Sequence, residues 1–267
     1  MRKKVLLRSI LALSIPIYFL GGCHKRIQDT SEKGELSLIA NGEDFIKEGF
    51  VAKDGWRVDF TKVNVTVDKI TAYQTDPPFN AEKDEKMVIS AKTVLLDAPT
   101  TVNLAADNRI LVARVEASPG FYNALSWQMA TAGPAENNTI LLAGKAEKHR
   151  RKINFAIALK KPVQYTCGEF VGEDRKGFLT PRDKADLEIT FHFDHLFGDG
   201  EKSPDDKINL TALGFAPFAN LAENGAIKAD MTTLKNKFSA REYQKLERSL
   251  TSLGHVGEGH CAKQGNF

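Results

Sequence analysis

The sequence predicts a mainly β protein, an antiparallel β-sandwich with a helical C-terminal appendage. Short runs of β-branched and aromatic residues recur from residue 35 to about residue 193, and turn residues separate them. After Asp194 the apolar residues change to helical spacing. With 42% hydrophobic and 27% charged residues, the chain has the composition of a globular protein rather than that of a disordered or fibrous one.

The expected strands are recognised by alternating apolar and polar residues. The run 58–60 alternates, and the run 63–67 continues the alternation after Thr61 and Lys62 have broken its phase, which predicts a β-bulge or a bend. Pro, Gly, Asp and Asn between the runs suit the backbone angles of turns. The other expected strands are 35–40, 87–96, 101–104, 110–117, 121–129, 139–143, 153–159, 163–167 and 187–193.

Two helices are expected near the C-terminus. Asp230 can cap a short helix over 231–238 that has its apolar residues on one face. Residues 239–242 (Ser-Ala-Arg-Glu) form a capping-box pattern that opens a second helix. The apolar residues of 243–253 follow helical spacing, and Gly254 is suited to a C-cap.

The N-terminal segment has the organisation of an export signal. Four basic residues lie within the first eight, and the uncharged run 9–20 follows them. A membrane-spanning helix needs ~20 apolar residues. The run is shorter than that and contains Pro16, and extending it backwards would include Arg8. A signal peptide is therefore favoured over a membrane span.

This run ends in Leu20-Gly21-Gly22-Cys23, which resembles the lipobox of bacterial lipoprotein signal peptides. The resemblance implies cleavage before Cys23, acylation of that cysteine, for example with palmitate, and a lipid anchor in the bacterial cell envelope. The protein would then lie at the outer face of the cytoplasmic membrane or in the outer membrane. An ordinary secretory signal with an incidental cysteine is the alternative.

Cleavage would also change the charge of the chain. It removes four of the 37 basic residues and none of the 34 acidic ones, so the formal charge falls from +3 to −1. The basic run 145–152 lacks aromatic residues for base stacking. We therefore expect no nucleic-acid partner; the expected partners are the membrane, through the lipid anchor, and an envelope protein.

The domain organisation follows from these features. We expect a signal peptide at 1–22, a polar tether at 23–34, the β-sandwich at 35–200, and a helical segment with a His- and Cys-containing tail at 201–267 that packs on the sandwich.

The segment 94–127 resembles a strand, strand, turn, strand pattern found in transthyretin-like and related bacterial lipoprotein domains, with Pro119-Gly120 at the turn. The resemblance covers roughly 35 residues. It implies a sandwich of the transthyretin-like or Ig-like kind and carries little about activity.

Apart from Cys23, the chain contains two cysteines, Cys167 and Cys261. An exported protein lies in a compartment that permits disulfides, so a bond between these two is predicted. The alternative is that Cys261, next to His260, is a thiolate metal ligand. The same sulfur cannot have both roles.

Four of the six histidines occur in two short C-terminal segments. In the first, His192 and Asp194 fall on the polar face of the expected strand 187–193, and His195 can join them only where the strand ends and the backbone turns. The second segment, 255–261, is rich in glycine and is expected to be a flexible loop that presents its imidazoles.

Imidazole and carboxylate groups are ligands for divalent transition metals, zinc or copper above all. The predicted ligands are His192, Asp194, His195, His255, Glu258 and His260. The opposing interpretation places His192 on an exposed sheet face and the tail histidines on the surface. Trp56, Phe121, Tyr122 and Trp127 are expected to belong to the core rather than to a ligand pocket.

The familiar catalytic motifs do not occur: there is no G-x-S-x-G elbow, H-E-x-x-H, P-loop or G-x-G-x-x-G. The sequence therefore predicts a non-enzymatic, lipid-anchored protein that buffers or delivers metal. A structural or accessory lipoprotein that scaffolds an envelope complex is the alternative. A hydrolytic metal centre would need an open coordination position and a general base.

Overall fold

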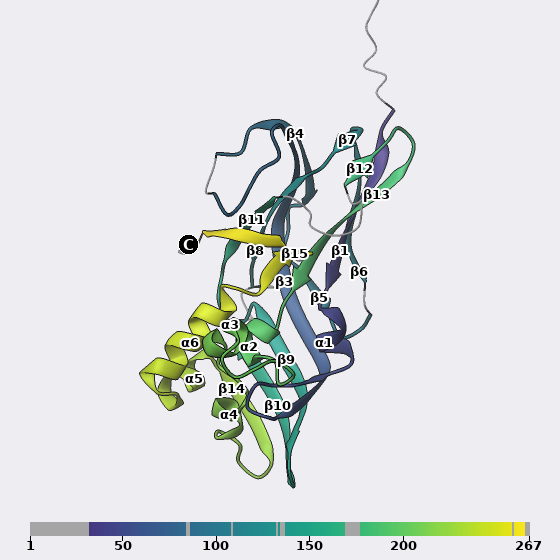
Figure 1. The fold of residues 1–267 in the computed structure, drawn as a ribbon. Helices are drawn as coiled ribbons and strands as arrows, with labels where there is room; N and C mark the ends of the chain where they lie inside the picture. Colours follow the sequence, from purple (N-terminus) through teal and green to yellow (C-terminus); the bar gives the residue numbers. More distant parts are fainter. Residues whose placement is uncertain are drawn as a thin grey trace, which may run out of the picture. The chain divides into compact units, whose positions relative to one another are not determined.

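The computed structural model describes residues 32–83, 86–107, 109–131, 133, 137–168, 177–257 and 259–264. The expected signal peptide, Cys23 and Glu258 lie outside these residues. The described part of the chain is mainly β, and helices gather beside one end of its large sheet (Figure 1). Within this part, no helix has the length and apolar character needed to cross a membrane.

The expected strands are present with similar starts. In chain order the strands are β1 Gly34–Asn41, β2 Phe50–Val51, β3 Arg57–Thr75, β4 Ile89–Leu96, β5 Thr100–Asn103, β6 Ile110–Ala117, β7 Gly120–Phe121, β8 Ala124–Met129, β9 Ile140–Lys148, β10 Arg151–Leu159, β11 Gln164–Gly168, β12 Phe178–Leu179, β13 Lys184–Phe191, β14 Ala226–Asp230, β15 Gly254–Val256 and β16 Gly259–Gln264. Of these, β2, β12, β14, β15 and β16 are additional strands that were not predicted from the sequence.

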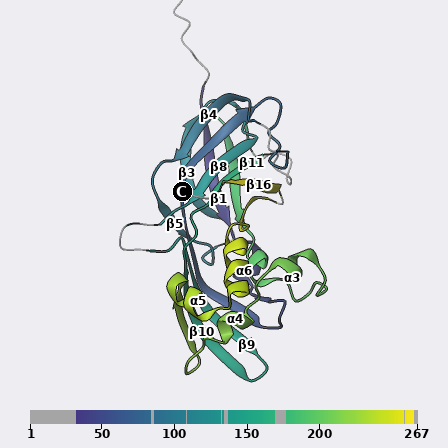
Figure 2. The same ribbon diagram turned by 90° about the vertical axis from the view of Figure 1, so that its left-hand side faces the viewer.

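The helices are short, apart from the last. They are α1 Glu43–Lys47, α2 Asp194–Phe197, α3 Lys207–Thr211, α4 Ala216–Ala219, α5 Met231–Lys237 and α6 Ala240–Leu250. Figure 2 shows α3 to α6 together beside β9 and β10.

Strand β3 organises the sheet, because it pairs with β2, β4, β5, β8 and β9. Its pairing with β9 shifts register between Phe60 and Lys62. The expected bulge is therefore confirmed. After the bulge, Val63, Val65 and Val67 are fully buried, so the extra residue returns the apolar side chains to the core face.

The sheet has the order β14-β10-β9-β3-β8-β11-β16-β15-β13-β1-β6. Most pairs are antiparallel, but β1 with β13 and β10 with β14 are parallel. The sheet is thus mixed, and the prediction of an antiparallel sheet is wrong for these pairs. Parallel neighbours need a long connection, and the periodicity of a single strand does not reveal its partner.

The sheet bends back on itself at the β15–β16 hairpin. Strand β16 pairs with β11, and β15 pairs with β13. The Trp127 ring on β8 lies 5.4 Å from the Phe191 ring on β13, although three strands separate β8 from β13 in the sheet order. In a flat sheet that separation would be about 19 Å. The two halves therefore face each other across one core.

The aromatic residues divide as expected, with one exception. Trp56, Tyr122 and Trp127 are buried in the core. Phe121 is 36% exposed and stacks on the ring of Phe178 at 3.8 Å. None of these rings lines the cavity described below.

The segment after residue 200 differs from the prediction of a helical appendage. Besides its helices it contributes β14, β15 and β16 to the large sheet. Both predicted caps form: the Asp230 side chain accepts from the Thr233 amide, and Ser239 and Glu242 make the capping box.

The prediction for Gly254 is wrong, because α6 ends at Leu250 with Thr251 as its C-cap, and Gly254 begins β15. A Cβ atom at Gly254 would lie 2.6 Å from the Trp127 ring and 2.7 Å from the Tyr165 ring. Glycine is needed here because the strand backbone packs directly on two aromatic rings.

The disulfide between Cys167 and Cys261 is present, with its Cα atoms 4.2 Å apart. The two residues lie directly opposite each other on β11 and β16. The prediction of the bond is confirmed, and the interpretation of Cys261 as a thiolate ligand is wrong because its sulfur is bonded to Cys167. The bond closes a separation of 94 residues and attaches the hairpin to one half of the sheet.

Removing this disulfide should lower the free energy of unfolding by about 2–5 kcal/mol. The comparison is between Cys23→Ala and the triple variant that also carries Cys167→Ala and Cys261→Ala, measured by guanidinium denaturation. In the Cys23→Ala protein, denatured without a reductant, thiol titration should detect no free thiol; two titratable thiols would show that the bond does not form.

Candidate metal centre

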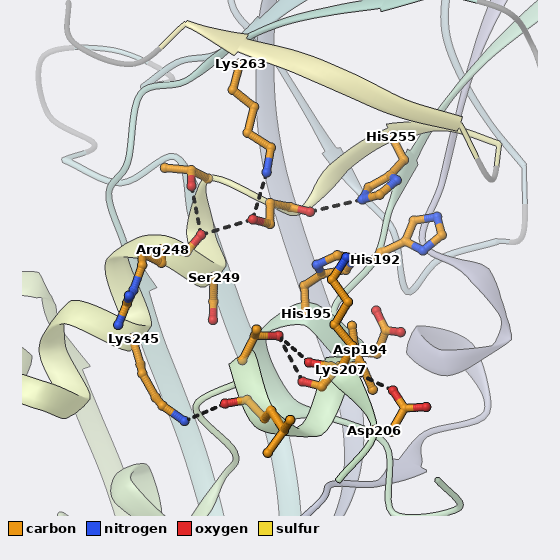
Figure 3. A pocket seen from close by; sticks show the side chains of 15 residues that line it. His192, Asp194, His195, Asp206, Lys207, Lys245, Arg248, Ser249, His255 and Lys263 are labelled. Carbon is orange, nitrogen blue, oxygen red and sulfur yellow. Dashed lines mark hydrogen bonds between the residues drawn. The ribbon is translucent and has the colours of Figure 1, made fainter. Parts of the chain in front are cut away.

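Three histidines from three separate segments meet at the end of β13. His192 directly follows β13, His195 lies in α2, and His255 lies in β15. One nitrogen from each imidazole can be chosen so that all three atoms lie within 4.8 Å of one another. Figure 3 shows the three rings side by side at one edge of a cavity.

The local sequence explains how His195 reaches His192. Phe193, Leu196 and Phe197 are buried, so the chain turns back toward the core as soon as β13 ends. The His195 amide donates to the His192 carbonyl at 3.3 Å within this turn. The expectation that His195 joins where the strand ends is confirmed.

The hairpin places the third imidazole. Strand β15 is antiparallel to β13 and sets His255 opposite Thr190. The His192 amide donates to the Leu253 carbonyl at 2.9 Å and extends this contact beyond the strand. The second histidine segment is therefore a β-hairpin rather than the expected flexible loop, and its register determines where His255 lies.

The three rings are close and mostly shielded from solvent. The His192 and His255 ring centroids are 4.2 Å apart, and those of His195 and His255 are 5.0 Å apart. His192 is 8% exposed and His255 is 4% exposed, while His195 is partly buried. The interpretation of His192 as an exposed sheet residue is thus wrong.

Backbone carbonyls orient two of the imidazoles. His192 Nε2 lies 3.3 Å from the Gly257 carbonyl and 3.5 Å from Glu43 Oε1. His255 Nε2 lies 3.1 Å from the Ser252 carbonyl. A carbonyl can only accept, so we assign the proton of each neutral ring to Nε2, which makes Nδ1 the nitrogen with the lone pair. Metal-ligating histidines are commonly oriented by this type of contact.

The cavity beside the rings has a volume of about 760 Å³. All three histidines line it, together with Asp194 and side chains from α3, α6 and β16. A ligand bound to the imidazoles would therefore have room on one side and the protein core on the other.

Among the predicted ligands whose side chains the structure describes, Asp194 does not belong to this group of three. Asp194 was expected on the strand face of His192, but it is the first residue of α2, where the chain has already left the strand. It lines the cavity, and its buried Oδ1 accepts no hydrogen bond from the described residues. His260 pairs with His255 through the hairpin backbone.

Sequence reasoning missed Glu43. This residue opens α1 with a positive φ of 59°, and its carboxylate approaches His192 from a segment 149 positions away. A positive φ is uncommon for a residue other than glycine. No local pattern indicates this contact, since it depends on β1 pairing with β13.

Comparison of the chain with protein-family models, curated proteins and solved structures finds no match.

The hydrogen bonds of the site predict tautomers. In metal-free protein at mildly alkaline pH, His192 and His255 should both be Nε2–H tautomers, because their Nε2 atoms face carbonyl oxygens. Long-range proton–nitrogen correlation spectra measure this directly, and the exposed His149 in the β9–β10 turn provides the comparison. Nδ1–H tautomers at both sites would contradict the assignment.

Proposed function

We propose that this protein binds a divalent transition metal through His192, His195 and His255, as a lipid-anchored component of the bacterial cell envelope. One observation carries the metal proposal: two imidazoles from one strand end and a third from a hairpin about 60 residues further along the chain can each offer a nitrogen within 4.8 Å of the others. Imidazole is a preferred ligand of zinc and copper.

The geometry suits an ion after a small rearrangement. A zinc–nitrogen bond of about 2.0–2.1 Å in a tetrahedral site implies nitrogen atoms roughly 3.3 Å apart. The imidazoles would close by up to about 1.5 Å relative to the 4.8 Å limit, which ring rotation can supply. The carbonyl contacts of His192 and His255 would hold these rings while His195 adjusts.

Three protein ligands leave a fourth position for water or another ligand, whereas structural zinc sites use four protein ligands. An open position on a cavity allows the metal to exchange. We therefore propose buffering or delivery of zinc or copper as the role, rather than stabilisation of the fold.

The location is proposed from the sequence around Cys23. Cleavage before this residue and its acylation would leave residues 23–34 as a tether between the lipid and β1. The disulfide supports an exported location, since such bonds persist in oxidising compartments. We also propose that the β-sandwich is of the transthyretin-like kind, on the basis of the resemblance of residues 94–127.

Purified, untagged protein reconstituted with zinc should hold about one equivalent of metal, measured by elemental analysis after desalting. His195→Asn should lower the affinity by roughly 100-fold or more, since one of three ligands is lost. His195 is the variant of choice because it is less buried than the other two.

His149→Asn is the matched control, because His149 is an exposed histidine at a turn. It has a positive φ, which asparagine tolerates. Metal retention by this control and loss by His195→Asn supports the site. Failure of the wild-type protein to retain zinc, copper or iron would overturn the metal proposal and favour an accessory role in an envelope complex.

The anchor is tested separately in bacteria. Wild-type protein should partition into the detergent phase after extraction, and Cys23→Ala should move to the aqueous phase, because it removes the residue that would carry the acyl chains. Equal partitioning of the two proteins would contradict lipidation at Cys23.

A further inference from the structure

The cavity beside the three histidines carries an excess of positive charge. Among the described residues that line it, four are cationic and two are carboxylates. The cations are Lys207, Lys245, Arg248 and Lys263, and the carboxylates are Asp194 and Asp206. With neutral imidazoles the lining has a formal charge of +2, before any metal is added.

These cations surround the space that the imidazoles face. Lys245 and Arg248 are three residues apart on α6 and share one side of that helix. Lys263 comes from β16, on the other strand of the hairpin that carries His255. In Figure 3, Lys245 and Arg248 line the side of the cavity opposite the histidines, and Lys263 lies above.

Hydrogen bonds position the two ammonium groups. Lys263 Nζ donates to Ser252 Oγ at 2.8 Å, and Lys245 Nζ donates to the Leu210 carbonyl at 3.0 Å. These partners are neutral, so they orient the ammonium groups without cancelling their charge. The guanidinium of the exposed Arg248 donates to a neutral amide, Gln244 Oε1, at 3.5 Å.

A further lysine, Lys53, lies beside Lys245, and the carboxylate of the adjacent Asp54 offsets part of its charge. Lys53 Nζ donates to the Ala212 carbonyl at 2.6 Å, and Lys245 Nζ lies 3.4 Å from the same oxygen. Burial lowers the pKa of Lys53, and the neighbouring Lys245 charge lowers it further. The protein thus holds two ammonium groups near one carbonyl at this edge of the cavity.

The carboxylates offset this charge only in part. Asp206 Oδ1 accepts from the Ile208 amide at 2.9 Å as the cap of α3, so that oxygen is already used by the helix. Asp194 lies at the start of α2, beside the histidines. A divalent ion on the imidazoles would add two charges to a lining that already has a positive excess, which favours an anion in the same cavity.

We propose that the cavity binds a multivalent oxyanion between Arg248 and the three imidazoles, and that this oxyanion supplies an oxygen ligand to the metal. Guanidinium groups bind carboxylate and phosphate groups through paired hydrogen bonds. A cavity of about 760 Å³ accommodates a small organic molecule, which is more than a metal and its water require. The ligation step rests on the proposed metal function; the anion site does not.

Titration calorimetry of the metal-free protein tests the anion site, with citrate and pyrophosphate as the two probes. The probe that binds with the higher affinity shows whether the site prefers carboxylate or phosphate groups. Arg248→Gln should weaken binding about tenfold, the effect of losing charge-assisted hydrogen bonds. Arg241→Gln is the matched control, since Arg241 is an exposed arginine on the same helix that does not line the cavity.

If Arg248→Gln and Arg241→Gln weaken binding of the probe equally, the probe is attracted by the net charge of the protein alone. If neither probe gives a heat of binding, there is no anion site. Either result overturns the proposal.

The ligation step is tested with cobalt, whose visible absorption reports its coordination geometry. In cobalt-loaded protein the preferred probe should change this absorption, bind at least about tenfold more tightly than to the metal-free protein, and leave the cobalt on the protein after desalting. An unchanged spectrum with equal affinities would overturn the ligation step. If the protein binds no metal but binds the probe through Arg248, the metal function fails and the anion site stands.

Discussion

The attachment of the β15–β16 hairpin to both halves of the sheet is the interaction on which the rest of the structure depends. Strand β15 pairs with β13, β16 pairs with β11, and the Cys167–Cys261 disulfide makes the second pairing covalent. The sheet bends here, so that the rings of Trp127 and Phe191 meet across the core. The same pairing brings His255 to His192. The same hairpin therefore closes the fold and positions the third imidazole of the site.

The packing under the hairpin explains why this arrangement is well defined. Gly254 lets the backbone of β15 lie directly on the rings of Trp127 and Tyr165, which stack with centroids 4.4 Å apart. Any side chain at this position would push the strand away from the core and move His255 with it. The imidazoles lie between a buried aromatic layer on one side and an open cavity on the other. At this position an ion could be held by the protein and still exchange with the solvent.

The local features of the fold could be predicted from the sequence. The bulge in β3 follows from a break in alternation at Thr61, and the caps at Asp230 and Ser239 follow from side chains that bond within three residues. The disulfide followed from counting cysteines. The parallel pairs could not be predicted, because each joins strands that are far apart in the chain and either partner alone looks like any other strand.

In the candidate metal centre, too, the local features could be predicted from the sequence and the tertiary contacts could not. His192 and His195 were predicted together because one strand end and one turn position them. Asp194 was misplaced because the strand was expected to extend to residue 193, two residues beyond the end of β13. The remaining parts of the site depend on tertiary contacts: the hairpin that carries His255, the approach of Glu43, and the cations of α6. The sequence could therefore suggest His255 as a metal ligand, but it could not indicate which residues would surround it.

Anomalous diffraction from a crystal of zinc-loaded protein at the zinc absorption edge shows directly whether the three imidazoles hold one ion. We expect a single strong peak about 2.0–2.1 Å from one nitrogen each of His192, His195 and His255. A peak elsewhere on the chain, or no peak between these rings at full zinc occupancy in solution, would contradict the proposed metal site.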